Sequence, residues 1–203
     1  MEDSTMTALI LGLIIFIGMH SVRIVSDDFR TRQIAKVGVN TWRAMYVAVS
    51  LVGFVLIVVG YGIARGDPVF VWNPPLWTRH ITILLTIPAF ILFAASFVPG
   101  TRMRAKVGHP LLAGVKTWAF AHLIANGTLA DILLFGAFLV WSIAAYASAR
   151  RRDRRAGTVY PVGPVMRDVT AVVAGLVAWA AFVFWLHAWL IGVAPMGIVV
   201  AAG

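Results

Sequence analysis

The sequence predicts an all-α protein, a polytopic bundle of about six transmembrane helices with no soluble domain. Of its 203 residues, 61% are hydrophobic and only 12% are charged. A mean hydropathy of +0.89 exceeds what a soluble domain of this size can bury, so lipid must cover much of the apolar surface. The apolar residues also fall in long runs separated by short polar segments, which is typical of multi-pass membrane proteins.

Six apolar runs are expected to be membrane spans within a single transmembrane domain covering residues 1–203. The first run follows the acidic residues Glu2 and Asp3, whereas a secretory signal peptide starts with positive charge, so we expect a retained helix. The fourth run is the shortest. Pro110 suits its first turn, and Asn126 and Gly127 suit a left-handed stop. The expected spans are residues 8–25, 42–63, 81–98, 110–126, 128–148 and 168–193.

The basic residues indicate how the chain crosses the membrane. The net charge of +9 does not indicate a nucleic-acid partner, because the cations stand in short clusters between apolar runs. Fourteen of them lie at the loops that follow the first, third and fifth spans: Arg23, Arg30, Arg32, Lys36, Arg43, Arg102, Arg104, Lys106, Arg150, Arg151, Arg152, Arg154, Arg155 and Arg167. Only Arg65 and Arg79 lie on the other side. Positively charged loops stay in the cytoplasm, so both termini are expected on the opposite, periplasmic side.

Several kinds of chemistry are excluded or not expected. The chain has no cysteine, which removes disulfides, thiolate haem ligands and covalent haem attachment. We find no paired carboxylates, no glycine-rich phosphate loop and no nucleophile–base constellation, so hydrolase and nucleotide chemistry are not expected. The five histidines are the residues best suited to carry a function.

The histidines divide into two groups by their surroundings. His80 lies at an expected membrane boundary, His109 precedes the proline that opens a helix, and His187 lies in an aromatic belt, so each has a structural explanation. His20 and His122 lie within apolar runs, where an imidazole without a partner is costly. For these two, a metal or haem ligand and a satisfied interhelical hydrogen bond both remain open.

Spacing limits which side chains can act together. His109 and His122 are thirteen residues apart, about 19 Å along a continuous helix, and they point to different sides, so they cannot bind one iron unless the helix breaks. Trp118 lies one turn before His122 and is placed to wall a flat ring. Arg23 lies one turn beyond His20, where it either pairs with a haem propionate or serves as a positive-inside anchor.

A specific set of motifs lies in the centre of the chain: His109-Pro110, Leu111-Leu112, Gly114-Val115-Lys116, Trp118-Ala119, Ala121-His122-Leu123, Asn126-Gly127 and Leu134-Phe135-Gly136. Further residues, His20, Arg79-His80 and Trp185-Leu186-His187, accompany them. With these residues the chain resembles, over nearly its whole length, the NnrU family of bacterial inner-membrane proteins. This resemblance implies a multi-pass protein of the inner membrane that supports nitrite and nitric oxide metabolism in denitrification. The expected partners are the lipid bilayer and the nitrogen-oxide respiratory enzymes or their assembly factors.

The NnrU family is similar to the ζ-carotene isomerase, a membrane enzyme that binds haem b through histidines. That similarity implies a haem b ligated by His122 and His20, with His109 thirteen residues before His122, as in the isomerase. Where the isomerase has a cysteine, this chain has Ala119, so a thiolate cannot replace a histidine ligand. The alternative function is an isomerase or oxidoreductase that acts on a lipophilic, carotenoid-like substrate.

Depth along the expected spans suggests a different grouping of the histidines. It places His80, His122 and His187 toward the periplasmic side, and His20 and His109 toward the cytoplasmic side. Helix tilt and side-chain reach can bring His20 and His122 to one cofactor. His187 therefore remains the second candidate partner of His122.

Overall fold

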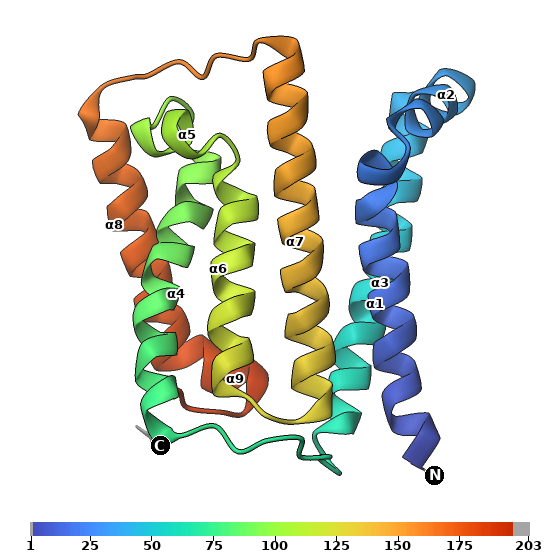
Figure 1. The fold of residues 1–203 in the computed structure, drawn as a ribbon, viewed down its shortest axis with the longest axis vertical. Coiled ribbons are helices and arrows are strands. Elements are labelled where there is room, and N and C mark those ends of the chain that lie inside the picture. Colours follow the sequence, from blue (N-terminus) through green and yellow to red (C-terminus); the bar gives the residue numbers. More distant parts are fainter. Residues whose placement is uncertain (1, 197–203) are drawn as a thin grey trace. The chain divides into compact units, whose positions relative to one another are not determined.

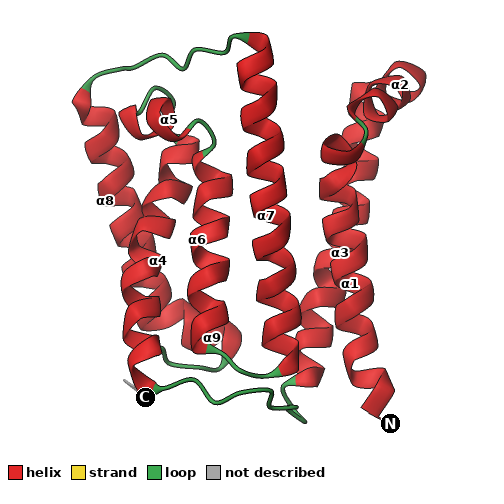
Figure 2. Cartoon of the chain, viewed as in Figure 1, coloured by secondary structure: helices red, strands yellow, loops and turns green. Residues whose placement is uncertain are grey.

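The computed structural model describes residues 2–196, with side chains from residue 6 onward, and over this range the chain forms helices and loops without a strand (Figure 2). The all-α prediction is therefore confirmed. The helices are α1 (Glu2–Val25), α2 (Asp27–Val37), α3 (Val39–Ala64), α4 (Leu76–Phe97), α5 (Arg102–Val107), α6 (Pro110–Ala125), α7 (Leu129–Ala156), α8 (Val165–Ala181), the π-helix η1 (Phe182–Leu186) and α9 (His187–Ile191).

Five of the helical stretches are long and apolar enough to cross a membrane: Met6–Val25, Val39–Ala64, Leu76–Phe97, Leu129–Ala156 and Val165–Ile191. The fourth expected span corresponds to α6, which has 16 residues, most of them apolar. At about 1.5 Å per residue it is roughly 24 Å long, shorter than the ~30 Å hydrocarbon core of a bilayer. The described range therefore contains five helices long enough to span a membrane and one short apolar helix.

The contacts divide the chain into two units, and the boundary between them falls inside α7. The first unit holds α1, α2, α3 and the part of α7 up to Ser148. The second unit holds α4, α5, α6, the end of α7, α8, η1 and α9.

In the first unit, α1 and α3 pack along each other so closely that only glycine fits at the crossing points (Figure 1). A Cβ atom on Gly53 would lie 2.7 Å from the backbone nitrogen of Phe16, and one on Gly12 would lie 2.6 Å from that of Ile57. A Cβ atom on Gly60 would overlap the backbone of Leu9. Small residues that let two backbones approach are the usual means of packing helices in lipid.

The second unit packs α4 against both α6 and α8 by the same means (Figure 1). A Cβ atom on Gly114 of α6 would lie 2.7 Å from the ring of Phe93, and one on Gly175 of α8 would lie 2.6 Å from the Cα atom of Ile91. Between α4 and α6, the hydroxyl of Thr82 donates a hydrogen bond to the carbonyl oxygen of Ala121 at 2.6 Å. This bond holds the backbone of Ala121, the residue that precedes His122, against α4.

Two segments expected to be loops are helical. Residues 26–41 were expected as a polar loop, but α2 occupies most of them, because Ser26 caps its first turn and Asp27 and Asp28 complement the positive end of the helix. The arginine run after residue 148 continues α7 to Ala156, and the helix stops at Gly157 with a φ of 61°.

The end of α6 also differs from the prediction. The helix stops before Asn126 as expected, but neither Asn126 nor Gly127 has a positive φ. Instead, the carbonyl oxygen of Gly127 accepts hydrogen bonds from the backbone N–H groups of Val71 (2.9 Å) and Trp72 (3.2 Å). Backbone hydrogen bonds between Gly127 and the α3–α4 connection, rather than a left-handed cap, therefore determine the turn after α6.

Candidate functional site

His20 lies near the end of α1 and is held by the backbone of its own helix. Its Nδ1 lies 2.7 Å from the carbonyl oxygen of Phe16, one turn earlier. A carbonyl oxygen can only accept, so Nδ1 carries the proton and, in the neutral ring, Nε2 carries the lone pair. This is the tautomer in which Nε2 can bind a metal.

Three aromatic rings surround the imidazole of His20. Phe16 stacks on it with ring centroids 4.1 Å apart, while Tyr46 of α3 and Trp141 of α7 meet it edge-on at 5.2 and 5.9 Å. The first unit alone supplies all of these rings. His20 therefore lies in an aromatic cage, which we define as Phe16, Tyr46 and Trp141.

His122 repeats the local geometry of His20 on α6. Its Nδ1 lies 2.9 Å from the carbonyl oxygen of Trp118, so Nδ1 again donates and Nε2 carries the lone pair in the neutral ring. The Trp118 and His122 rings are 5.1 Å apart at their centroids. The predicted proximity of Trp118 and His122 on one face of the helix is confirmed.

The other histidines have different surroundings. His80 is exposed in the first turns of α4. His187 opens α9 directly after the π-helix, and its Nδ1 lies 2.7 Å from the carbonyl oxygen of Val193. α9 lies at the end of the second unit where α6 stops (Figure 1). His187 therefore shares a unit with His122, whereas His20 belongs to the other unit.

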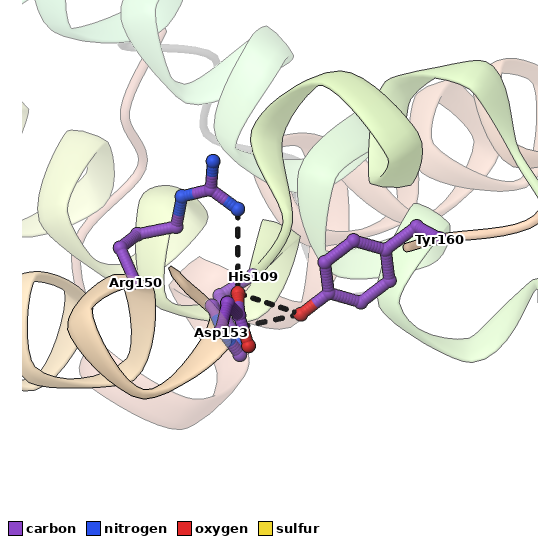
Figure 3. Close-up of polar contacts among 4 residues, drawn as sticks. All are labelled: His109, Arg150, Asp153 and Tyr160. Carbon is purple, nitrogen blue, oxygen red and sulfur yellow. Dashed lines mark hydrogen bonds and ion pairs between the residues drawn. The ribbon is translucent and has the colours of Figure 1, made fainter. Parts of the chain in front are cut away.

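His109 belongs to a polar cluster at the start of α6, formed with Arg150, Asp153 and Tyr160 (Figure 3). Its Nε2 lies 2.9 Å from Oδ2 of Asp153, and the hydroxyl of Tyr160 donates to the same oxygen at 2.9 Å. Because a carboxylate oxygen only accepts, Nε2 of His109 carries a proton. This tautomer is opposite to that of His20 and His122.

Cations complete this polar cluster. Arg150 donates to Oδ2 of Asp153 at 3.3 Å, and its guanidinium occupies the space beside Gly108, whose φ is 79°. Arg104 lies 5.8 Å from the centre of the Tyr160 ring. Burial raises the pKa of the Tyr160 phenol, and the hydrogen bond to Asp153 and the charge of that carboxylate raise it further. The cluster joins α5, α6, the end of α7 and the following linker.

Two further polar side chains in the first unit have structural partners. Arg23 forms an ion pair with Asp27 at 3.5 Å, and its side chain is 55% exposed. Asp131 is buried and accepts hydrogen bonds from the hydroxyls of Tyr61 and Thr128, each at 2.6 Å. Thr128 and Asp131 thus cap the first turn of α7, a structural role for this carboxylate.

The structure places the predicted residues at four positions: His20 with Arg23 on α1, His122 with Trp118 on α6, His109 in the polar cluster, and His187 on α9. No group of three or more His, Cys, Asp or Glu side chains suited to a bare metal ion occurs in the described part of the chain. A haem iron needs only one or two histidines from the protein. The pairing of His20 with His122 joins different units and stays a prediction.

Sequence reasoning did not find Tyr46, Trp141, Asp153 and Tyr160. The first two contact His20 from helices that are distant along the chain, so these contacts cannot be predicted from residue spacing along one helix. The role of Asp153 was indicated by the sequence, because it is the one acidic residue within the arginine run from Arg150 to Arg155. An acid in that position is suited to bind a partner from another segment.

The fold and the site define a multi-pass helical membrane protein with imidazoles inside its apolar helices. The family model described as NnrU protein matches residues 8–195, nearly the whole chain. The protein belongs to the NnrU family. Comparison with curated proteins and with solved structures gives no match.

Proposed function

We propose that this protein supports nitrite and nitric oxide metabolism from the inner membrane, and that it binds haem b through His20 and His122. The observation that carries the proposal is the shared geometry of these two side chains. Each Nδ1–H donates to the carbonyl oxygen of the residue four positions earlier, which leaves the lone pair on Nε2. Ligand histidines in metalloproteins are commonly oriented by such a second hydrogen bond.

The surroundings of both histidines fit a haem. Aromatic rings lie against each imidazole, and flat apolar walls suit a porphyrin. The chain has no cysteine, so histidine coordination is the available kind.

Each residue has a defined part in this proposal. His20 and His122 hold the iron, and the carbonyls of Phe16 and Trp118 fix the orientation of their rings. Arg23, one turn beyond His20, pairs with a propionate as well as with Asp27. When bound, haem b supplies one-electron redox chemistry and an iron that binds nitrogen oxides.

His109 acts differently from the other two under this proposal. Its Nε2 carries a proton and is bound to Asp153, so it serves to hold the start of α6 rather than to bind iron through that atom. His187 shares the second unit with His122 and is the alternative second ligand.

The ligand assignment is tested by the ratio of haem to protein in single variants purified under one protocol. His122→Ala and His20→Ala should each lose haem or change from a six-coordinate to a five-coordinate spectrum. His80→Ala is the matched control, because His80 is exposed, and it should retain the wild-type ratio. Retention of a wild-type spectrum by His20→Ala together with its loss in His187→Ala would assign the second ligand to His187.

The cellular role is tested separately in a strain that lacks this gene and respires nitrite. We expect accumulation of nitrite or nitric oxide that the wild-type gene corrects and the His122→Ala gene does not. A partner among the nitrogen-oxide respiratory enzymes or their assembly factors should then co-purify with the wild-type protein. Normal nitrite consumption in the strain without the gene would contradict this role.

A further inference from the structure

Among the described residues of the first unit, two polar atoms are buried without a hydrogen-bond partner: Oγ of Ser50 and Nε1 of Trp141. Other hydroxyls inside the apolar helices donate to a backbone carbonyl three or four residues earlier, as do those of Thr82, Thr86, Ser96, Thr117, Ser142 and Thr170. The indole N–H of Trp179 likewise donates to Thr86 at 3.1 Å. Ser50 and Trp141 therefore differ from the other hydroxyl and indole groups named here, because their donors have no acceptor among the described residues.

Both residues lie next to aromatic side chains that meet the same pair of residues on α1, His20 and Phe16. Ser50 lies one turn after Tyr46 and one turn before Phe54 on α3, and these two rings contact His20 (5.2 Å) and Phe16 (6.4 Å). Trp141 contacts His20 from α7, and Phe138, one turn earlier, contacts Phe16 at 5.8 Å. Ser50 and Trp141 thus lie on the turns of α3 and α7 whose aromatic rings meet the segment of α1 that carries His20.

We propose that the first unit binds a neutral, lipid-soluble molecule beside His20, and that the hydroxyl of Ser50 and the indole N–H of Trp141 donate hydrogen bonds to a carbonyl oxygen of that molecule. Burial of a donor without an acceptor costs free energy, and a ligand oxygen removes that cost. An indole N–H can only donate, so the ligand must carry an acceptor.

The charges nearby determine that the ligand is neutral. Arg23 and Arg43, the cations closest along α1 and α3, lie at the ends of these helices. Ser50 is seven residues beyond Arg43, about 10 Å deeper along the helix, so an anion at Ser50 would lack a cation at membrane depth. An ammonium group carries no acceptor, so it would leave the indole N–H of Trp141 unpartnered. The aromatic cage around His20 suits a flat ring, and a quinone combines such a ring with carbonyl oxygens.

The inference does not depend on haem binding. Ser50 and Trp141 lie within one unit, and neither is a proposed iron ligand. Ser50→Ala should therefore leave the haem-to-protein ratio unchanged, whereas failure of the haem proposal would appear in that ratio and not in ligand affinity.

The experiment measures binding of decylubiquinone to the full-length protein in lipid nanodiscs by titration calorimetry. Decylbenzene, which has a similar tail and ring but no carbonyl, measures simple partition into the nanodisc. We expect saturable binding of the quinone only. Trp141→Phe and Ser50→Ala should each weaken it about 3- to 10-fold, the loss of one hydrogen bond. Equal heats from both compounds would overturn the proposal.

Matched variants control for unspecific effects. Trp185→Phe replaces a tryptophan that is 60% exposed, and Ser96→Ala replaces a serine whose hydroxyl donates to Phe93 at 2.6 Å. Both should bind the quinone as the wild type does. Without quinone, Ser50→Ala should melt at or above the wild-type temperature, because it removes a hydroxyl that has no partner in the described part of the chain. A lower melting temperature, or unchanged affinity in both Ser50→Ala and Trp141→Phe, would show that these groups hold at most a structural water.

Discussion

Nε2 of His109 lies 2.9 Å from Oδ2 of Asp153, a residue 44 positions later in the chain, and this contact joins the start of α6 to the end of α7. It also fixes the proton of His109 on Nε2, while His20 and His122 carry theirs on Nδ1. The hydrogen-bond partners therefore separate His109, which ties helices together, from His20 and His122, whose Nε2 can bind iron. His187, whose Nδ1 also lies against a carbonyl oxygen, resembles the latter two.

The polar cluster should give the protein an alkaline titration that depends on Asp153. The pKa of Tyr160 is raised above the ordinary value of about 10, first by burial and then by its hydrogen bond to Asp153. A raised pKa means that the protonated phenol stabilises the fold. This contribution is complete below the unfolded pKa and is lost as the pH rises through the folded pKa.

The titration is measured by tyrosinate absorbance, as the difference between the wild type and Tyr160→Phe. Asp153→Asn should move the midpoint part of the way back toward the ordinary value, because burial of the phenol remains. An unchanged midpoint in Asp153→Asn would show that the carboxylate does not contribute.

The glycine contacts between α1 and α3 should be sensitive to a single methyl group. Gly53→Ala places a Cβ atom 2.7 Å from the backbone nitrogen of Phe16, and backbone cannot move aside cheaply. We expect a loss of about 1–3 kcal/mol in the free energy of unfolding in detergent. Gly62→Ala on the same helix is the control, since no atom lies within 4 Å of its added Cβ. Equal stability of the two variants would contradict this close packing.

The capping carboxylate of α7 should matter for stability and not for a cofactor. Asp131→Ala removes the acceptor of both Tyr61 and Thr128, and we expect it to cost about 2 kcal/mol. Tyr61→Phe should cost less, because it removes one bond and leaves the cap at Thr128. Thermal melting in detergent measures both effects. If Asp131→Ala kept its melting temperature but lost haem, Asp131 would instead orient a ligand.

The loop charges predict the orientation in the membrane. A reporter inserted at Gly157, where α7 ends, should behave as cytoplasmic, and one fused at Gly203, outside the described residues, should behave as periplasmic. The reverse pattern would contradict the orientation. Matching signals at both positions would mean that the number of membrane crossings between them is even.

The helices were predictable from the sequence because lipid requires long apolar segments, and such segments are visible in composition. The exceptions were local. The segment after the first span was expected to be a loop because it is polar, but a helix starts there at Ser26, Asp27 and Asp28. Asn126 and Gly127 had the composition of a left-handed stop, but tertiary hydrogen bonds from Val71 and Trp72 determine that turn.

The candidate site was predictable only where neighbours share a helix. Trp118 lies one turn from His122, so its position followed from helix geometry. The contacts of His20 with Tyr46 and Trp141, and of His109 with Asp153, bring together residues on different helices. Periodicity along one helix carries no information about which residue of another helix lies opposite.

The most direct test of the haem proposal is the absorption spectrum of the purified full-length protein, recorded oxidised and then reduced with dithionite. The proposal predicts a Soret band that sharpens and shifts on reduction, with the α and β bands of a six-coordinate haem b ligated by two histidines. Protein purified from haem-replete cells that shows only the absorbance of its tryptophans and tyrosines, and that takes up no added haemin, would contradict it.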